Sequence, residues 1–191
     1  FLKKEKGDAF ILAGGTDLLV KMKLGISAPD LVVDIKKIPA MNAINHNASG
    51  SKIGAAVSGA ELGEHKGLSK SWPGVVEATN LIGSDQVQSR ATMVGNLCNA
   101  SPAADSVPAM IAAGAKAIVV GSTKRRTVPV EKVVTGPGQT SLADDEVIEA
   151  ITLPKRGKRA GDAYLRFIPR TEMDIAVVSA GVNLTLERGV V

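Results

Sequence analysis

The chain has 191 residues, of which 45% are hydrophobic, and this is enough for a sizeable core in one domain or in a domain with an appendage. Aromatic residues make up 3% and the net charge is only +4, with no recognised nucleic-acid-binding motif, so we expect no nucleic-acid partner. The single cysteine, Cys98, excludes an internal disulfide and a cysteine-ligated cluster. No run of residues is long enough to span a membrane and no signal peptide is visible, so we expect a soluble, cytoplasmic protein.

The first part of the chain predicts a local βαβ unit. Phe1–Gly7 is typical of the last turn of a helix that stops at a glycine. The apolar run Ala9–Ala13 predicts a buried strand, and the spacing of apolar residues from Leu18 to Gly25 predicts a helix. Leu31–Ile35 predicts a second buried strand, close enough in sequence to pair with the first.

The rest of the chain mixes short strands and helices, without an internal repeat. Together with the βαβ unit, these elements predict an α+β fold class. In chain order the patterns predict a hairpin over 41–54, a capped helix from Ser58, a helix over 75–82, a helix over 109–113, a strand pair over 117–130, a loop over 133–139, a strand over 147–153, a basic linker from 155, and strands over 163–169 and 176–186, the last without a partner.

The four residues Gly14-Gly15-Thr16-Asp17 join the first predicted strand to the first predicted helix. The first N–H groups of a helix have no partner inside the helix and attract anions, and glycines let the backbone approach an oxygen closely. The motif is neither GxGxxG nor GxxxxGK[ST], which excludes the Rossmann and P-loop fingerprints. It predicts either a phosphate-binding turn or an ordinary tight turn in which Asp17 stabilises the start of the helix.

A second stretch, Arg90–Pro108, is dense in small and polar residues. Such residues bury little apolar area, but they suit a backbone that passes close to a polar ligand. Amide and hydroxyl side chains can donate to phosphate, whereas a carboxylate suits a ribose hydroxyl. The two glycine-containing loops could therefore grip both halves of a dinucleotide's pyrophosphate. The alternative is a polar loop that caps a helix through Asp105 or Ser106.

No group of residues predicts a catalytic centre or a metal site. Asp144-Asp145-Glu146 is most simply a solvated turn. Cys98 has no histidine near it in sequence, and His46 and His65 lack metal-ligand spacing. We therefore expect a bound cofactor to carry any chemistry.

Four segments follow one another in the order and spacing of a known family and cover nearly the whole chain: Ile11–Leu18, Ala91–Pro102 with Asp105, Asp145–Pro154, and Asp174–Ala176. With these segments the chain resembles the FAD-binding subunits or domains of the molybdenum hydroxylases, the xanthine dehydrogenase and carbon monoxide dehydrogenase type. Four matching segments together are far more specific than either glycine loop alone.

The resemblance implies a two-subdomain FAD-binding fold of the vanillyl-alcohol-oxidase/PCMH type, with FAD between subdomains of about 1–54 and 55–154. A linker over 155–162 would lead to the beginning of a truncated C-terminal α+β domain over 163–191. The residues that it implies for FAD contacts are Leu12, Ala13, Gly14, Gly15, Thr16, Asp17, Leu18, Ile82, Thr92, Gly95, Asn96, Asn99, Ser101, Asp105, Ile148 and Arg166.

Three positions depart from the family pattern. Val94 stands where the family usually has the first of two glycines, which stiffens the loop. Gln88-Ser89-Arg90 replaces Arg-Asn-Arg, which removes one cation. Arg166 stands where relatives tend to carry lysine, and it presents a planar fork rather than a point charge.

By the same resemblance, the chain is expected to transfer electrons. It would receive electrons from a [2Fe-2S] iron–sulfur subunit. That subunit would receive them from a molybdopterin subunit that hydroxylates a substrate. FAD would then reduce an acceptor such as NAD or a quinone. Two alternatives stay open. The chain could be a stand-alone flavin-dependent oxidoreductase of the same superfamily, or a non-catalytic nucleotide-binding module.

Overall fold

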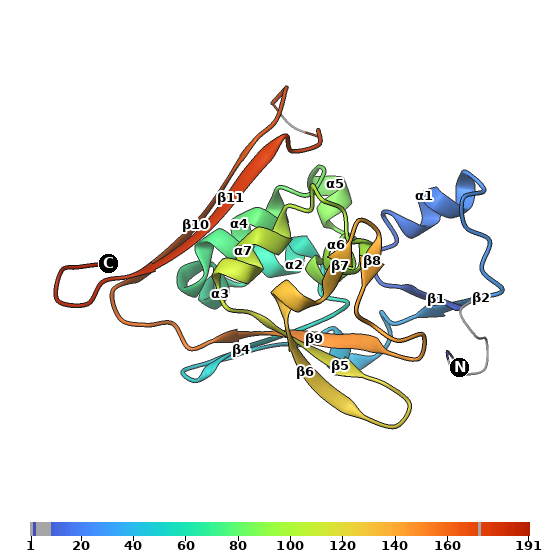
Figure 1. Cartoon of the computed structure of the whole chain (residues 1–191), viewed down its shortest axis with the longest axis horizontal. Helices are drawn as coiled ribbons and strands as arrows, with labels where there is room; N and C mark the ends of the chain where they lie inside the picture. Colours follow the sequence, from blue (N-terminus) through green and yellow to red (C-terminus); the bar gives the residue numbers. More distant parts are fainter. Residues whose placement is uncertain (1, 3–8, 172) are drawn as a thin grey trace.

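The computed structural model describes residue 2, residues 9–171 and residues 173–191. The helix end predicted over 1–7 lies almost wholly outside the described residues. Figure 1 shows a layer of helices above a sheet, with a small βαβ unit on one flank and a long two-stranded hairpin on the other. This mixture of strands and helices confirms the α+β class.

The predicted βαβ unit is confirmed. Strand β1 (Ala9–Leu12) leads into α1 (Leu18–Lys23), and β2 (Leu31–Asp34) then pairs parallel with β1. Both strands are half-buried rather than buried, because the sheet has only two strands and α1 has no buried residue with which to cover it.

The main sheet is antiparallel and has five strands in the order β3-β4-β9-β5-β6. Two predicted hairpins and the predicted strand over 147–153 form it. Its strands are β3 (Ile44–Asn47), β4 (Gly50–Gly54), β5 (Lys116–Val120), β6 (Arg125–Pro129) and β9 (Val147–Pro154). Strands β3 and β4 thus pair with a strand from the predicted second subdomain, and the subdomain boundaries stay predictions.

A layer of helices lies above the main sheet (Figure 1), and local sequence features mark the start of several of them. Ser58 and Glu61 form a capping box: the Glu61 N–H donates to Ser58 Oγ at 3.2 Å, and the Ser58 N–H donates to Glu61 Oε2 at 2.9 Å. Pro73 begins another, because proline suits the first helical turn. The helices are α2 (Gly59–Glu64), α3 (Lys66–Ser71), α4 (Pro73–Asn80), α5 (Asp85–Gln88), α6 (Met93–Asn99) and α7 (Ser106–Ala112).

Four short elements complete the body. Two are 3-10 turns, η1 (Pro39–Met41) and η2 (Val130–Lys132). The segment predicted as a loop over 133–139 contains strand β7 (Val134–Gly136), which pairs with β8 (Gln139–Thr140). Pro137 and Gly138 therefore lie in the turn of a small hairpin. No described helix is long and apolar enough to cross a membrane.

The last two strands form a hairpin that extends along the helical layer (Figure 1). Strand β10 (Ala160–Phe167) pairs along its whole length with β11 (Val178–Thr185), so the prediction that the strand over 176–186 has no partner is wrong. The segment between them turns the chain back, which local sequence patterns did not indicate. Alternate side chains of β10 face the helices, and Tyr164 among them is only 1% exposed.

Candidate functional site

A cavity of about 370 Å³ lies between the βαβ unit, α6 and the start of β9. This volume falls within the range of pockets that hold cofactors. Its lining comes from segments far apart in the chain: Phe10, Ile11, Ala13, Gly14, Gly15, Thr16, Asp17, Leu18, Lys21, Ile35, Ala55, Ile82, Ala91, Thr92, Val94, Gly95, Asn96, Cys98, Asn99, Gly138, Leu142, Glu146, Val147 and Ile148.

The loop from β1 to α1 lines the cavity and has backbone N–H groups that the described residues do not engage. The second of its two glycines, Gly15, has a backbone φ of +81°, a conformation that residues with side chains rarely adopt. Lys36 steadies the start of the loop, because its Nζ donates to the Ala13 carbonyl at 3.1 Å. Among the hydrogen bonds of the described residues, none uses the backbone N–H of residues 14 to 18 as donor. These groups are therefore available to an anion.

Gly14 brings this loop against the second predicted segment. A β-carbon built on Gly14 would lie 2.2 Å from the Arg90 carbonyl oxygen and 2.9 Å from Ala91 Cα. Both neighbours are backbone atoms, which cannot swing aside as a side chain can. The absence of a side chain at Gly14 thus lets the two segments meet at one cavity.

The second segment is largely helical, which differs from the expected loop. Thr92 caps α6, and its Oγ1 accepts from the Gly95 N–H at 2.9 Å. That N–H is therefore already paired. Val94, in place of a family glycine, is 5% exposed and packs in the hydrophobic core. Residues 93–99 of the segment predicted as a polar loop thus form a capped helix of about two turns beside the cavity.

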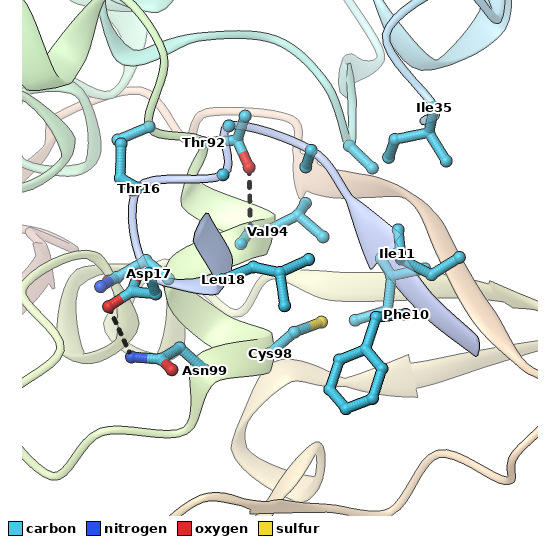
Figure 2. Close-up of a pocket in the computed structure, with 18 of the residues that line it drawn as sticks. Phe10, Ile11, Thr16, Asp17, Leu18, Ile35, Thr92, Val94, Cys98 and Asn99 are labelled. Carbon is cyan, nitrogen blue, oxygen red and sulfur yellow. Dashed lines mark hydrogen bonds between the residues drawn. The ribbon is translucent and has the colours of Figure 1, made fainter. Parts of the chain in front are cut away.

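Three polar side chains close one end of the cavity. Asn99 Nδ2 donates to Asp17 Oδ1 at 3.2 Å, and Lys21 Nζ donates to Asn99 Oδ1 at 2.8 Å. Figure 2 shows the Asp17–Asn99 bond at this end. The bond ties α1 to α6, and Lys21 adds a cation near the free N–H groups.

The opposite end of the cavity is apolar. Phe10, Ile11 and Ile35 lie there in Figure 2, away from the Asp17–Asn99 pair. Val147 and Ile148 of β9 also line the cavity. An apolar end of this kind suits the flat face of an aromatic ring, whereas the loop N–H groups suit phosphate oxygens.

The carboxylate that sequence analysis assigned to a solvated turn is in fact buried. Glu146 is 7% exposed and lines the cavity. Arg126 donates to both of its oxygens, at 2.8 Å from Nε and 2.6 Å from Nη2, and the Ala143 N–H donates at 3.0 Å. The hydrogen bonds from Arg126 lower the pKa of Glu146 from 4.5 to about 2. Glu146 is therefore a paired anion rather than an acid–base group.

This ion pair predicts a dependence of stability on pH. Because the pKa of Glu146 is about 2 in the folded chain and ordinarily 4.5, the pair stabilises the fold above about pH 4.5, and the stabilisation is lost as pH falls toward 2. Arg126→Met should lower the melting temperature at neutral pH, and its difference from wild type should shrink across that window.

Thermal melts between neutral pH and pH 2 check this prediction. Arg125→Met is the matched control, since the Arg125 side chain is 56% exposed and its partner Glu149 keeps Lys52 at 2.6 Å. A constant difference between Arg126→Met and wild type across the pH range would contradict the assignment.

Cys98 lines the cavity but is not an activated thiol. Burial raises the pKa of its thiol to about 12, so the neutral form persists at physiological pH. Among the described residues, no group of three or more His, Cys, Asp and Glu side chains could hold a metal ion.

The structure brings twelve of the sixteen predicted FAD contacts together around the cavity: Ala13, Gly14, Gly15, Thr16, Asp17, Leu18, Ile82, Thr92, Gly95, Asn96, Asn99 and Ile148. Four others do not line it: Leu12, Ser101, Asp105 and Arg166. Both carboxylate oxygens of Asp105 are engaged, one by Tyr164 and the other by Arg166, each at 2.9 Å. Whether each of the sixteen contacts FAD stays a prediction.

Sequence reasoning missed cavity residues of two kinds. Lys21 stands four residues after Asp17, a helical spacing that could have placed both on one face of α1. The apolar residues Phe10, Ile35, Ala55 and Leu142 carry no such signal, because only the packing of distant segments brings them to the cavity.

The cavity fits FAD in two respects. The free N–H groups of residues 14 to 18 match a pyrophosphate, and the apolar end matches an aromatic ring. The lining contains two carboxylates, and each accepts a hydrogen bond from this chain. Asn99 donates to Asp17, and Arg126 donates to Glu146. Both acids are thus engaged within the chain, while the N–H groups are not.

Comparison with known proteins agrees with this geometry. Residues 1–156 match the model of the FAD binding domain in molybdopterin dehydrogenase. A xanthine dehydrogenase FAD-binding subunit of Escherichia coli O157:H7 is 30% identical over 190 residues, which cover 98% of this chain and 65% of the relative. The carbon monoxide dehydrogenase medium chain of Hydrogenophaga pseudoflava is 33% identical over 164 residues, which cover 86% of this chain and 57% of the relative.

The fold is also that of a solved relative. The structure of carbon monoxide dehydrogenase from Hydrogenophaga pseudoflava, which lacks the Mo-pyranopterin moiety of its molybdenum cofactor, superposes with a TM-score of 0.93 at 31% identity. The match covers 98% of this chain and 65% of that chain, so the present chain spans about two thirds of that relative's length. The family match over most of the chain and the structural match together show that the chain belongs to the family of FAD-binding domains of molybdopterin dehydrogenases.

Proposed function

We propose that this chain holds FAD in the cavity between its βαβ unit and its main body, and that it passes electrons within a multi-subunit molybdopterin hydroxylase. The observation that supports the FAD site is the row of free N–H groups at residues 14 to 18, in a loop that lines a cavity whose opposite end is apolar. FAD, when bound, supplies the ability to accept an electron pair and to release it to an acceptor.

The residues of the chain have binding and orienting roles in this proposal. The N–H groups of the β1–α1 loop hold the pyrophosphate, and Lys21 adds a positive charge beside them. Asn99 joins α1 to α6 and keeps the two sides of the site together. Glu146 and Cys98 serve as neither acid nor base, since the carboxylate of Glu146 is paired and the thiol of Cys98 stays protonated.

Partners follow from the relatives and from the chemistry. Relatives are named as the FAD-binding subunit of xanthine dehydrogenase and the medium chain of carbon monoxide dehydrogenase. We propose that a molybdopterin subunit passes electrons to a [2Fe-2S] subunit, which passes them to the present chain. We propose that NAD or a quinone then receives the electrons. The proposed location is the cytoplasm.

Anaerobic reduction of the purified native complex tests this function. We expect the tagged chain to co-purify with iron–sulfur and molybdenum subunits, and its yellow flavin absorbance to bleach when the complex meets its hydroxylation substrate. Xanthine, carbon monoxide and nicotinate are the first candidates, because three relatives are named as subunits of dehydrogenases of these compounds. If the chain is instead a monomer and a small molecule reduces its flavin directly, the result would support a stand-alone oxidoreductase.

A further inference from the structure

A second cavity, of about 300 Å³, lies at the other end of the main sheet from the first. It is enclosed by the turn between β3 and β4, the end of α3, and residues 154 to 156 at the end of β9. The first cavity meets β9 at Val147 and the second meets it at Pro154, and an extended strand of 8 residues places these two ends roughly 20 Å apart. Figure 1 shows one end of β9 toward the βαβ unit and the other toward the start of β4. The second cavity is therefore separate from the proposed FAD site.

A histidine in the lining of the second cavity is held between two serine hydroxyls. His46 Nδ1 lies 2.8 Å from Ser51 Oγ, and His46 Nε2 lies 3.3 Å from Ser71 Oγ. The His65 ring packs edge-on against it, with 5.8 Å between the ring centroids. A β-carbon on Gly67 would lie 2.7 Å from His46 Cδ2, so the absence of a side chain there lets α3 approach the ring. These contacts fix the position of the ring, and with it the positions of both hydroxyls.

The bonds of His46 leave at least one hydroxyl proton for a ligand. A neutral imidazole has one nitrogen that donates and one that accepts, whereas a protonated ring donates from both nitrogens. In either state, at least one of the two serines accepts its hydrogen bond from His46 and keeps its own O–H as a donor. Since Ser51 and Ser71 both line the cavity, that O–H can serve an acceptor within it.

Two cations complete the lining. Lys155 and Arg156 follow the end of β9, and among the described residues no carboxylate lines this cavity. The Arg156 guanidinium stacks on the Trp72 ring, with Cζ 4.2 Å from the ring centroid. Its Nη2 lies 3.0 Å from Asp162 Oδ1, and its Nη1 donates to Asn183 Oδ1 at 3.3 Å. A guanidinium has five N–H groups, so these contacts hold Arg156 in place and leave other donors for a ligand.

We infer that the second cavity binds a small phosphate-bearing anion, which Lys155, Arg156 and a serine hydroxyl hold. The donors come from different elements: the hydroxyls belong to β4 and α3, and the cations to the segment after β9. A tetrahedral phosphate presents oxygens in several directions to such a set, and the guanidinium fork matches two of them. A planar carboxylate has only two oxygens and meets fewer of these donors. The inference does not depend on FAD binding, since the two cavities share no lining residue.

Trp72 makes a direct test possible, because it is the only tryptophan of the sequence and lies in this lining. Inorganic phosphate, titrated into the purified 191-residue chain at constant ionic strength, should change the tryptophan emission saturably, with a dissociation constant of about 1 mM. The affinity should be the same with and without one equivalent of FAD. AMP as a second probe separates the two sources of the phosphate group: tighter binding than that of phosphate indicates a nucleotide, and weaker binding indicates free phosphate. Acetate should bind roughly tenfold more weakly than phosphate.

Paired variants separate the site from general effects of charge. Lys155→Met should weaken phosphate binding about tenfold and Ser71→Ala about threefold, the scales of a charged and a neutral hydrogen bond. Lys158→Met removes the same charge from the same exposed segment, and Ser69→Ala removes a hydroxyl from the same helix. Both residues lie outside the lining, so neither variant should change binding. Melting temperatures identify variants that fail to fold. Equal losses in Lys155→Met and Lys158→Met would overturn the inference, as would a folded wild-type chain that shows neither a change in emission nor heat of binding on titration with phosphate.

Discussion

Replacing Gly15 with valine will weaken FAD binding by roughly 10- to 100-fold. The backbone of Gly15 has φ +81°, where a β-branched residue is strained by about 1–3 kcal/mol. A β-carbon there would also lie 2.8 Å from Leu12 Cδ1 and 3.1 Å from Leu19 Cδ1. The loop must shift to accept the side chain, which displaces the N–H groups that we assign to the pyrophosphate. Equilibrium titration with FAD measures the loss.

Gly25→Val is the matched control for this variant. Gly25 has a similar φ, +70°, but a β-carbon there would have no neighbour within 4 Å, and the residue lies outside the cavity lining. Both variants should melt at a lower temperature, and only Gly15→Val should lose FAD affinity. Ser122→Val, in a turn outside the cavity lining, should leave FAD affinity unchanged. Equal FAD affinity in Gly15→Val and Gly25→Val would place the pyrophosphate elsewhere.

Gly14→Ala will separate the two sides of the cavity. The added methyl group would overlap the Arg90 carbonyl oxygen, which cannot yield without moving the backbone before α6. We expect both a lower melting temperature, since over-packing costs roughly 1–3 kcal/mol, and a loss of FAD affinity of at least tenfold.

Gly161→Ala provides the corresponding control. Gly161 lies on β10, its φ is not positive, and its added β-carbon would have no neighbour within 4 Å. This variant should keep both stability and FAD affinity. FAD affinity near the wild-type value in Gly14→Ala would show that the loop and α6 do not hold the cofactor jointly.

Local patterns predicted the elements whose signals lie within a few neighbouring residues. The βαβ unit was visible because two apolar runs flank a glycine turn and a helical spacing. The capping box at Ser58 and Glu61 and the hairpin around 47–50 were visible for the same reason. Most of the cavity lining followed from the two polar segments and from the family resemblance.

Long-range pairing accounts for what the sequence did not reveal. Glu146 was assigned to a solvated turn because its partner Arg126 stands 20 residues away on another strand. Strand β11 was predicted to lack a partner, because local patterns indicate a second strand after β10 but not that the two strands pair. The contact of Asp105 with FAD stays a prediction, but its hydrogen bonds to Tyr164 and Arg166, about 60 positions further along the chain, could not be read from local patterns. Such contacts depend on how elements pack, which spacing alone does not specify.

The most direct test of the account is a titration of the purified 191-residue chain with FAD, with ADP and FMN as comparison ligands. We predict saturable binding of one FAD per chain and measurable binding of ADP, because ADP keeps the pyrophosphate that the N–H groups of residues 14 to 18 would hold, and weaker binding of FMN, which lacks a pyrophosphate. The absence of FAD binding to the folded chain, or FMN binding as tight as that of FAD, would contradict the account.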